Sequence, residues 1–222
     1  GTLAAVKTVR AATVPIERFD EDAIAGLRVA IDQVDWSGFG GRYVVLITDA
    51  GALDATDPKS QTRLGIAEIK ALAEERGVAL FAIHLLTPEG RSNHASARAQ
   101  YQELTRYGAA GSLYFPVEGG SPQAFERVVN GLTNALFRRV ADTVGRPVGG
   151  VEPARTPEAE RMAQQVEIVA TAMRLAYLGR EGGTTAPDVV RSFTTDRDLR
   201  DPTLPSLDVR VLLTRNQLSD LS

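Results

Sequence analysis

The carboxylate best placed for chemistry is that of Asp49, which comes at the end of the apolar stretch 43–51, YVVLITDAG. The run before it is continuous and rich in β-branched residues, and glycines lie on both sides. This pattern is typical of a strand buried on both faces of a parallel sheet. Open α/β sheets bind ligands at the carboxyl ends of their strands, so Asp49 is a candidate ligand-binding residue. The alternative is a carboxylate that caps the next turn through backbone N–H groups.

Two groups of acids flank Asp49 in the sequence. The run 20–22, DED, precedes a segment with helical periodicity, so we expect it in the first turn of a helix, where the helix dipole favours negative charge. Asp54 and Asp57 lie in the following loop, but the glycine and the distal glutamate of a calcium-binding loop are missing. Neither group is expected to bind a metal ion.

The chain has two histidines and no cysteine, which excludes disulfides, thiolate nucleophiles and cysteine-ligated metals. His84 lies inside an apolar run and His94 at an expected helix start, so the two lack metal-ligand spacing, and we expect His84 to be a hydrogen-bonded core residue. No nucleophile elbow, phosphate-binding glycine loop or kinase signature occurs. An enzymatic function would therefore rest on Asp49 as an acid–base group, with Asp54 or His84 as its partner.

Composition indicates an ordinary globular protein, with 43% hydrophobic and 24% charged residues. The formal net charge of −3 does not favour binding to nucleic acid or to an anionic membrane surface. No segment approaches the roughly 20 apolar residues of a membrane span, so we expect no membrane insertion. The lack of cysteine fits a reducing compartment, and we expect a cytoplasmic protein, with periplasmic exposure as the alternative.

Helices and strands alternate along the first part of the chain. This order predicts an α/β fold, a doubly wound and mostly parallel sheet with helices on both faces. Pro116 suits a strand end or a sheet edge. The expected strands are 43–48, 78–86 and 112–117, and the expected helices are 3–12, 19–34, 62–76, 94–107 and 121–144.

Residues 1–145 are expected to form the sheet domain, 146–156 a Gly- and Pro-containing linker, and 157–222 a small α/β module. In that module we expect a helix over 157–178 and a strand over 207–213. Three strong strands make a thin sheet, and the first residue is not Met, so we expect the N-terminal strands of the fold to precede Gly1. An uncovered sheet edge invites pairing with another chain, which predicts a homodimer through that edge.

The stretch Leu46-Ile47-Thr48-Asp49-Ala50-Gly51 resembles the end of the fourth strand of von Willebrand factor type A (vWA) domains. A closer resemblance is to the vWA-bearing C-terminal regions of bacterial Ser/Thr protein kinases associated with type VI secretion. The stretches that carry it are FDEDAIAGL, WSGFGGRY, VLITDAGAL, LTPEG with NHA, and LDVRVLLTRNQLSDL.

In vWA domains the Asp after this strand belongs to a metal-ion-dependent adhesion site, so the resemblance implies that Asp49 helps to hold Mg²⁺ or another divalent cation. The family's main metal motif, Asp-x-Ser-x-Ser, is absent here and would precede Gly1, and a second-loop ligand would fall within 13–22. We therefore expect weak or no metal binding by this chain.

The resemblance implies a non-catalytic protein-interaction or sensing module of a larger bacterial signalling protein, with a protein as its partner. A small-molecule enzyme that uses Asp49, and a structural scaffold with a degenerate metal site, are the alternatives.

Overall fold

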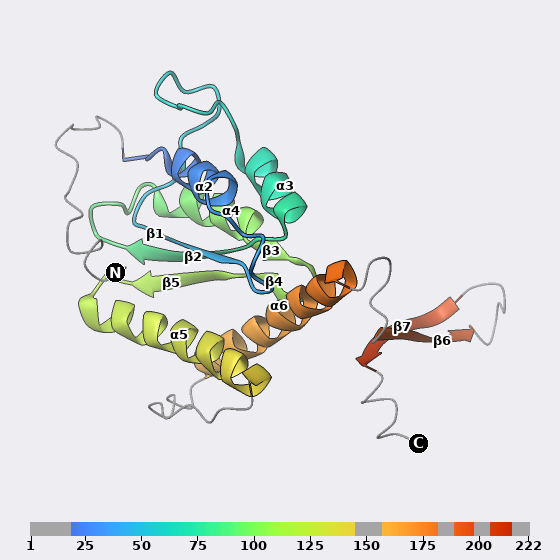
Figure 1. Ribbon diagram of the computed structural model, residues 1–222. Helices are drawn as coiled ribbons and strands as arrows, with labels where there is room; N and C mark the ends of the chain where they lie inside the picture. Colours follow the sequence, from blue (N-terminus) through green and yellow to red (C-terminus); the bar gives the residue numbers. More distant parts are fainter. Residues whose placement is uncertain (1–18, 145–156, 182–188, 198–204, 215–222) are drawn as a thin grey trace.

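A three-stranded parallel sheet lies at the centre of the molecule, in the order β1-β2-β5 (Figure 1). The computed structural model describes residues 19–144, 157–181, 189–197 and 205–214. The strands are β1 (Tyr43–Thr48), β2 (Ala79–Leu86) and β5 (Tyr114–Glu118). The expected α/β fold with a parallel sheet and helices on both faces is confirmed.

The central strand is β2, not β1, and the expectation that β1 is buried on both faces is wrong. Every residue of β2 except Leu85 is buried, whereas in β1 Val45 and Ile47 keep 37% and 50% of their surface exposed. Successive side chains of a strand point to opposite faces. One of the two faces of β1 is therefore only partly covered.

Three helices cover the first face of the sheet: α2 (Ala23–Asp32), α3 (Ile66–Arg76) and α4 (His94–Leu104). Two of them, α3 and α4, connect neighbouring parallel strands in the same direction along the sheet. Because such crossovers are right-handed, both helices lie on one face, above the sheet in Figure 1. The buried residues of this core are Ile24, Leu27, Ile31, Ala52, Ile69, Ala73, Val78, Leu80, Ala82, Ala97, Tyr101, Leu104 and Tyr114.

The second face is covered by α5 (Pro122–Val144) and α6 (Pro157–Glu181), which lie below the sheet in Figure 1. The sequence predicts α6 as the start of a separate module, but its apolar stripe packs into the core of the sheet domain. An apolar stripe indicates only that a helix packs against something, and here α5 and the sheet provide that surface. The buried residues of this core are Ala79, Phe81, Ile83, Ala110, Leu113, Phe115, Val117, Leu132, Met162, Val166, Val169 and Met173.

Several helix ends follow from local chemistry. Gly77 ends α3 in the left-handed conformation, with φ of 63°, as its position predicts. Ser121 caps α5 through its hydroxyl, which accepts from the Ala124 N–H at 3.3 Å. Asp22 is the N-cap of α2, so the acids of 20–22 precede this helix instead of forming its first turn.

The helix expected over 94–107 ends earlier, at Leu104. A small two-stranded antiparallel element follows it. It is formed by β3 (Arg106–Tyr107), the 3₁₀ turn η1 (Gly108–Ala110) and β4 (Gly111–Ser112). Gly108 and Gly111 both have positive φ, which makes this tight reversal possible.

Towards the C-terminus, β6 (Val189–Arg197) and β7 (Pro205–Thr214) pair as an antiparallel hairpin. The strand expected over 207–213 is confirmed. The helix expected over 3–12, the linker 146–156 and the helix start expected near 216–222 lie outside the described residues. Within the described ranges, no helix combines the length and the apolar composition needed to span a membrane.

Candidate functional site

The segment that follows β1 is held in place by side chains from other parts of the fold. The Ala50 N–H bonds to the Thr48 hydroxyl at 3.1 Å, and the Gly51 N–H donates to Oδ1 of Asn93 at 2.7 Å. The buried hydroxyl of Tyr101, on α4, donates to the Ala50 carbonyl at 2.7 Å. Two successive residues after β1 are therefore anchored, Ala50 to Tyr101 of α4 and Gly51 to Asn93, the N-cap of α4.

Gln100 extends this anchor by one residue. Its Oε1 accepts from the Ala52 N–H at 3.0 Å, and its Nε2 donates to the Ala52 carbonyl at 3.0 Å, as a neighbouring strand would. On the other side, Glu21 forms an isolated parallel bridge with Ala52. In this bridge the Glu21 N–H donates to the Gly51 carbonyl, and its carbonyl accepts from the Leu53 N–H, both at 2.9 Å. The acids that precede α2 are thereby brought beside the end of β1.

Gly51 is required here by close packing. A Cβ at this position would lie 2.7 Å from Oδ1 of Asp20, 3.0 Å from Oε1 of Gln100 and 3.1 Å from Oδ1 of Asn93. Asn93 in turn donates from Nδ2 to Asp20 at 2.6 Å. A side chain at Gly51 would therefore push apart the polar residues that hold the segment.

Asp49 does not cap the turn that follows it, which was the structural alternative for this residue. The amide groups of 50–52 are bonded to Thr48, Asn93 and Gln100. The Asp49 side chain is half-buried and makes no hydrogen bond or ion pair with another described residue. Asp49 therefore stays a candidate ligand-binding residue at the carboxyl end of β1.

A second carboxylate, that of Glu21, lies close enough for the charge of Asp49 to affect its pKa. Partial burial, and then the negative charge of Asp49, raise the pKa of Glu21 above its usual value. Two carboxylates that repel one another in this way favour a cation between or beside them. The carboxyl end of β1 is therefore an electronegative site.

The sequence predicts Asp49 and a second-loop ligand within 13–22, which contains Glu21 without singling it out, but it does not identify Asn93 and Gln100 as parts of the site. One signal was present. Asn93 and Gln100 are two helical turns apart, on the same face of α4 as the buried Ala97 and Leu104. Polar side chains on an otherwise buried stripe need polar partners, but the pattern does not say which.

His84 is the hydrogen-bonded core residue that the sequence predicts. It is fully buried, and its Nδ1 lies 2.8 Å from the Tyr114 hydroxyl. Burial, and then the nearby His94, lower the pKa of His84, so the ring is neutral. His94 packs against it nearly at a right angle, with ring centroids 5.7 Å apart. The two histidines meet in space, although they are on different elements.

Asp54 does not join this site. Its carboxylate accepts from the N–H and the hydroxyl of Thr56, at 2.8 and 2.7 Å, and these bonds lower the pKa of Asp54. Asp57 accepts from the Lys59 N–H in the same way, at 2.9 Å. Both are turn residues, as expected from their lack of a calcium-loop pattern.

The fit of a divalent cation is limited by the number of ligands. Asp49 and Glu21 supply two carboxylates, and the described residues contain no group of three or more histidine or acidic side chains that could hold a metal ion. Mg²⁺ often binds through one or two carboxylates and retains several waters. The residues present therefore fit a weak, largely hydrated site.

Comparisons of the chain with known protein families, curated proteins and solved structures gave no match. Its function must therefore be inferred from the geometry of the sheet and its two edges.

Proposed function

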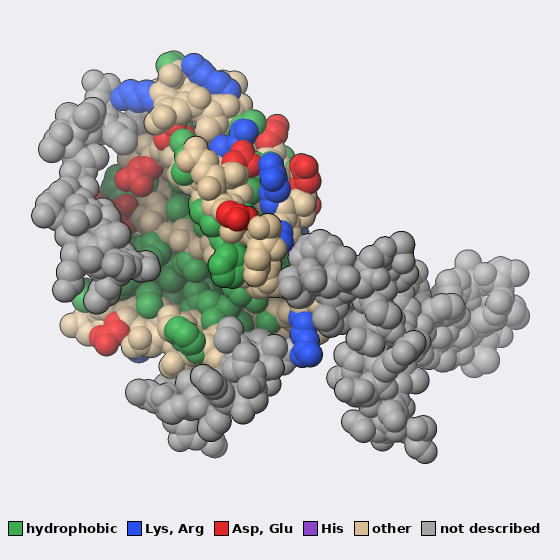
Figure 2. Space-filling view, viewed as in Figure 1, with side chains coloured by type: hydrophobic (Ala, Val, Ile, Leu, Met, Phe, Trp, Pro, Cys, Tyr) green, Lys and Arg blue, Asp and Glu red, His purple; other side chains and the backbone are tan. Residues whose placement is uncertain are grey.

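We propose that this chain is a non-catalytic protein-interaction module of a larger bacterial signalling protein, as its resemblance to the vWA regions of secretion-linked Ser/Thr kinases implies. The observation that carries the proposal is the outer edge of β1, which ends at Asp49. Figure 2 shows hydrophobic side chains gathered in a hollow over the sheet region, between the lobe of α2 and α3 and the helix α5. Acidic side chains lie near the rim of the hollow.

The backbone of Val45 and Ile47 lies on the outer edge of β1, away from β2. The Arg42 carbonyl accepts from the Ala79 N–H at 2.9 Å, so Arg42 directs its backbone towards β2. Backbone direction alternates along a strand, and that of Val45 and Ile47 therefore points away from β2. No other strand of the described residues pairs with this side of β1. Such an edge is a template for an added strand.

The side chains beside these groups suit an apolar partner segment. Val45 and Ile47 lie on the second face, next to Tyr43 in the strand's alternation, and both stay partly exposed. An extended segment that paired with β1 could bury both side chains with its own alternate residues. Its end would lie near Asp49 and Glu21, where a divalent ion with open coordination positions would accept a carboxylate of the partner.

One partner to test is a second copy of this chain, paired edge to edge. Sedimentation velocity over a concentration series should show a dimer for the wild type and a monomer for Ile47→Lys, because a charged side chain disfavours strand addition. Val29→Lys is the matched control, since Val29 is also 50% exposed but lies on α2. A wild-type monomer at all concentrations would exclude the homodimer and leave a different protein as the partner.

The metal component is tested separately by titration of Mg²⁺ and Mn²⁺ in a calorimeter. Weak binding is expected for the wild type, loss of binding for Asp49→Asn, and unchanged binding for Asp54→Asn. Equal losses in both variants, or no binding by the wild type, would favour a scaffold without a metal-dependent contact. Pulldown of an apolar partner by the wild type but not by Ile47→Lys would still support the edge as the docking surface.

A further inference from the structure

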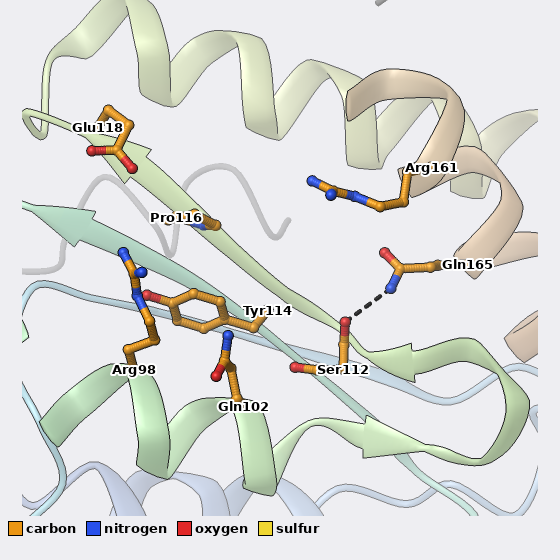
Figure 3. Close-up of a pocket in the computed structure, with 8 residues that line it drawn as sticks. All are labelled: Arg98, Gln102, Ser112, Tyr114, Pro116, Glu118, Arg161 and Gln165. Carbon is orange, nitrogen blue, oxygen red and sulfur yellow. Dashed lines mark hydrogen bonds between the residues drawn. The ribbon is translucent and has the colours of Figure 1, made fainter. Parts of the chain in front are cut away.

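The opposite edge of the sheet, along β5, carries a polar cavity of about 350 Å³ (Figure 3). Residues of α4, of β5 and of α6 line it, together with Ser112 of β4. Cavities of roughly 300–1,000 Å³ are typical of small-molecule sites. The lining residues are Arg98, Gln102, Ser112, Tyr114, Pro116, Glu118, Arg161 and Gln165.

This edge is closed to strand addition. The Ala82 N–H donates to the Leu113 carbonyl at 3.1 Å, so the alternation of backbone direction turns Pro116 towards the cavity. Proline has no N–H to offer an added strand. On the same side, Nε2 of Gln165 donates to the carbonyls of Ala110 and Ser112, at 3.0 and 2.9 Å. A peptide could not form a regular ladder here, which favours a small molecule as the occupant.

The charge of the cavity is positive. Arg98 reaches into it from α4 and Arg161 from α6, so the two guanidinium groups approach from opposite faces of the sheet (Figure 3). Glu118 is the single acidic residue of the lining, and neither arginine forms an ion pair with a described residue. Two cations against one anion contrast with the net charge of −3 of the whole chain.

The Arg98 guanidinium lies next to a buried tyrosine. It lies beside the hydroxyl of Tyr114 (Figure 3), a side chain that is only 9% exposed and whose hydroxyl lies 2.8 Å from Nδ1 of His84. Burial raises the pKa of Tyr114, and the nearby Arg98 counteracts part of that rise. Among the described residues no acceptor is hydrogen-bonded to the Arg98 guanidinium, so its N–H groups can serve a ligand. A guanidinium fork matches the oxygens of a phosphate or a carboxylate.

We propose that this cavity binds a small molecule bearing an oxyanion, phosphate or carboxylate, between Arg98 and Arg161. The amide side chain of Gln102 and the hydroxyl of Ser112 supply neutral polar contacts at the same cavity. The cavity is larger than one oxyanion group and leaves room for the rest of the ligand. This site is independent of the proposed docking edge on β1.

The test is calorimetric titration of the full chain with pyrophosphate and, in a separate arm, with citrate, at constant ionic strength. The wild type should bind at least one of them. Arg98→Gln and Arg161→Gln should each weaken binding by about tenfold or more, because each removes a charge-assisted contact. Tighter binding of pyrophosphate would assign a phosphate ligand, and tighter binding of citrate a carboxylate ligand.

Matched controls separate a site from general attraction of anions. Arg174→Gln removes an exposed arginine from the same helix as Arg161, outside the cavity lining, and should leave the affinity unchanged. Gln102→Glu adds a negative charge at an exposed position of the lining and leaves both arginines in place. It should weaken binding of an anion by repulsion. Equal weakening by Arg174→Gln, or no binding of either probe by the wild type, would overturn the proposal. Both cavity arginines are exposed, so their variants should fold, which circular dichroism would verify.

Discussion

The two edges of the central sheet differ in whether they can pair with an added strand. The outer edge of β5 presents Pro116, and polar side chains from α4 and α6 flank it. The outer edge of β1 presents the backbone of Val45 and Ile47, with which no other described strand pairs, and their apolar side chains lie beside it. An edge without protection is a liability unless something pairs with it. The difference supports the proposal of protein contact at β1 and of a small ligand at β5.

The two edges also differ in their charge. At the carboxyl end of β1, Asp49 and Glu21 make an electronegative site, whereas the β5 cavity holds two arginines against Glu118. His84 and Tyr114 lie between the two regions. Asp49 affects the pKa of His84, and Nδ1 of His84 lies 2.8 Å from the Tyr114 hydroxyl, next to Arg98. The two edges thus share a buried polar connection through the sheet.

The largest expected effect comes from Phe81→Ala, which removes the side chain that supports both edges. Phe81 is fully buried on β2, and its ring lies 6.1 Å from that of Tyr43 on β1 and 6.3 Å from that of Phe115 on β5. The free energy of unfolding should fall by about 3–5 kcal/mol because of the cavity created. Urea denaturation followed by Trp36 fluorescence measures this loss.

Phe39→Ala is the control for that experiment, because Phe39 is 58% exposed. Its effect should stay within about 0.5 kcal/mol. Similar losses for the two variants would mean that β2 does not carry the packing of both edges.

Tyr101→Phe should lower the free energy of unfolding by a smaller amount, because it affects only the segment after β1. The substitution leaves the buried Ala50 carbonyl without the hydroxyl that donates to it at 2.7 Å. The cost should be about 0.5–1.5 kcal/mol, since one hydrogen bond is lost while the Thr48 hydroxyl still lies 3.1 Å from the same carbonyl. Chemical denaturation compares it with Tyr107→Phe, whose half-buried hydroxyl bonds to no described residue and should contribute much less. Equal values would show that the Thr48 hydroxyl alone satisfies the Ala50 carbonyl.

Pro116→Val would make the two edges more alike. Valine restores an N–H on the outer side of β5, and the change in stability should stay within about 1 kcal/mol. In a background of Ile47→Lys, which blocks β1, sedimentation velocity should then detect new self-association. Continued absence of association would mean that the flanking side chains, and not Pro116, protect this edge.

The smallest effect concerns the pH dependence of stability at the β1 site. The pKa of Glu21 is raised in the folded state, so its favourable contribution is complete below the unfolded pKa and is lost as pH rises through the folded value. Asp49→Asn removes the second cause of the shift and should lower the pKa of Glu21. Because Glu21 is largely exposed, the gain in stability at neutral pH should be below about 0.5 kcal/mol.

Carboxyl-detected NMR titration of Glu21 in the wild type and in Asp49→Asn measures this shift directly. Asp54→Asn is the control, because Asp54 bonds only within its own turn. A Glu21 pKa that is the same in all three proteins would show that Asp49 does not influence it.

The sequence by itself determined the elements and their order, because these depend on local chemistry. The apolar runs of β1 and β2 predict strands, and the left-handed Gly77 and the Ser121 cap end or begin helices where expected. Alternation of the elements then predicts the parallel sheet. It also placed Asp49 at the end of a strand, and its metal-binding role stays a prediction.

Only the tertiary structure decided which strand is central, because an apolar run looks the same whether a neighbour covers one face or both. The same holds for α6, whose apolar stripe does not specify its partner. The contacts of Asn93 and Gln100 with the segment after β1 join residues 42 and 48 positions apart. Arg98 and Arg161 lie on solvent-facing sides of two helices and become a pair only when the fold brings those helices to one edge. Such pairings depend on the packing of the whole sheet domain, which local sequence patterns do not encode.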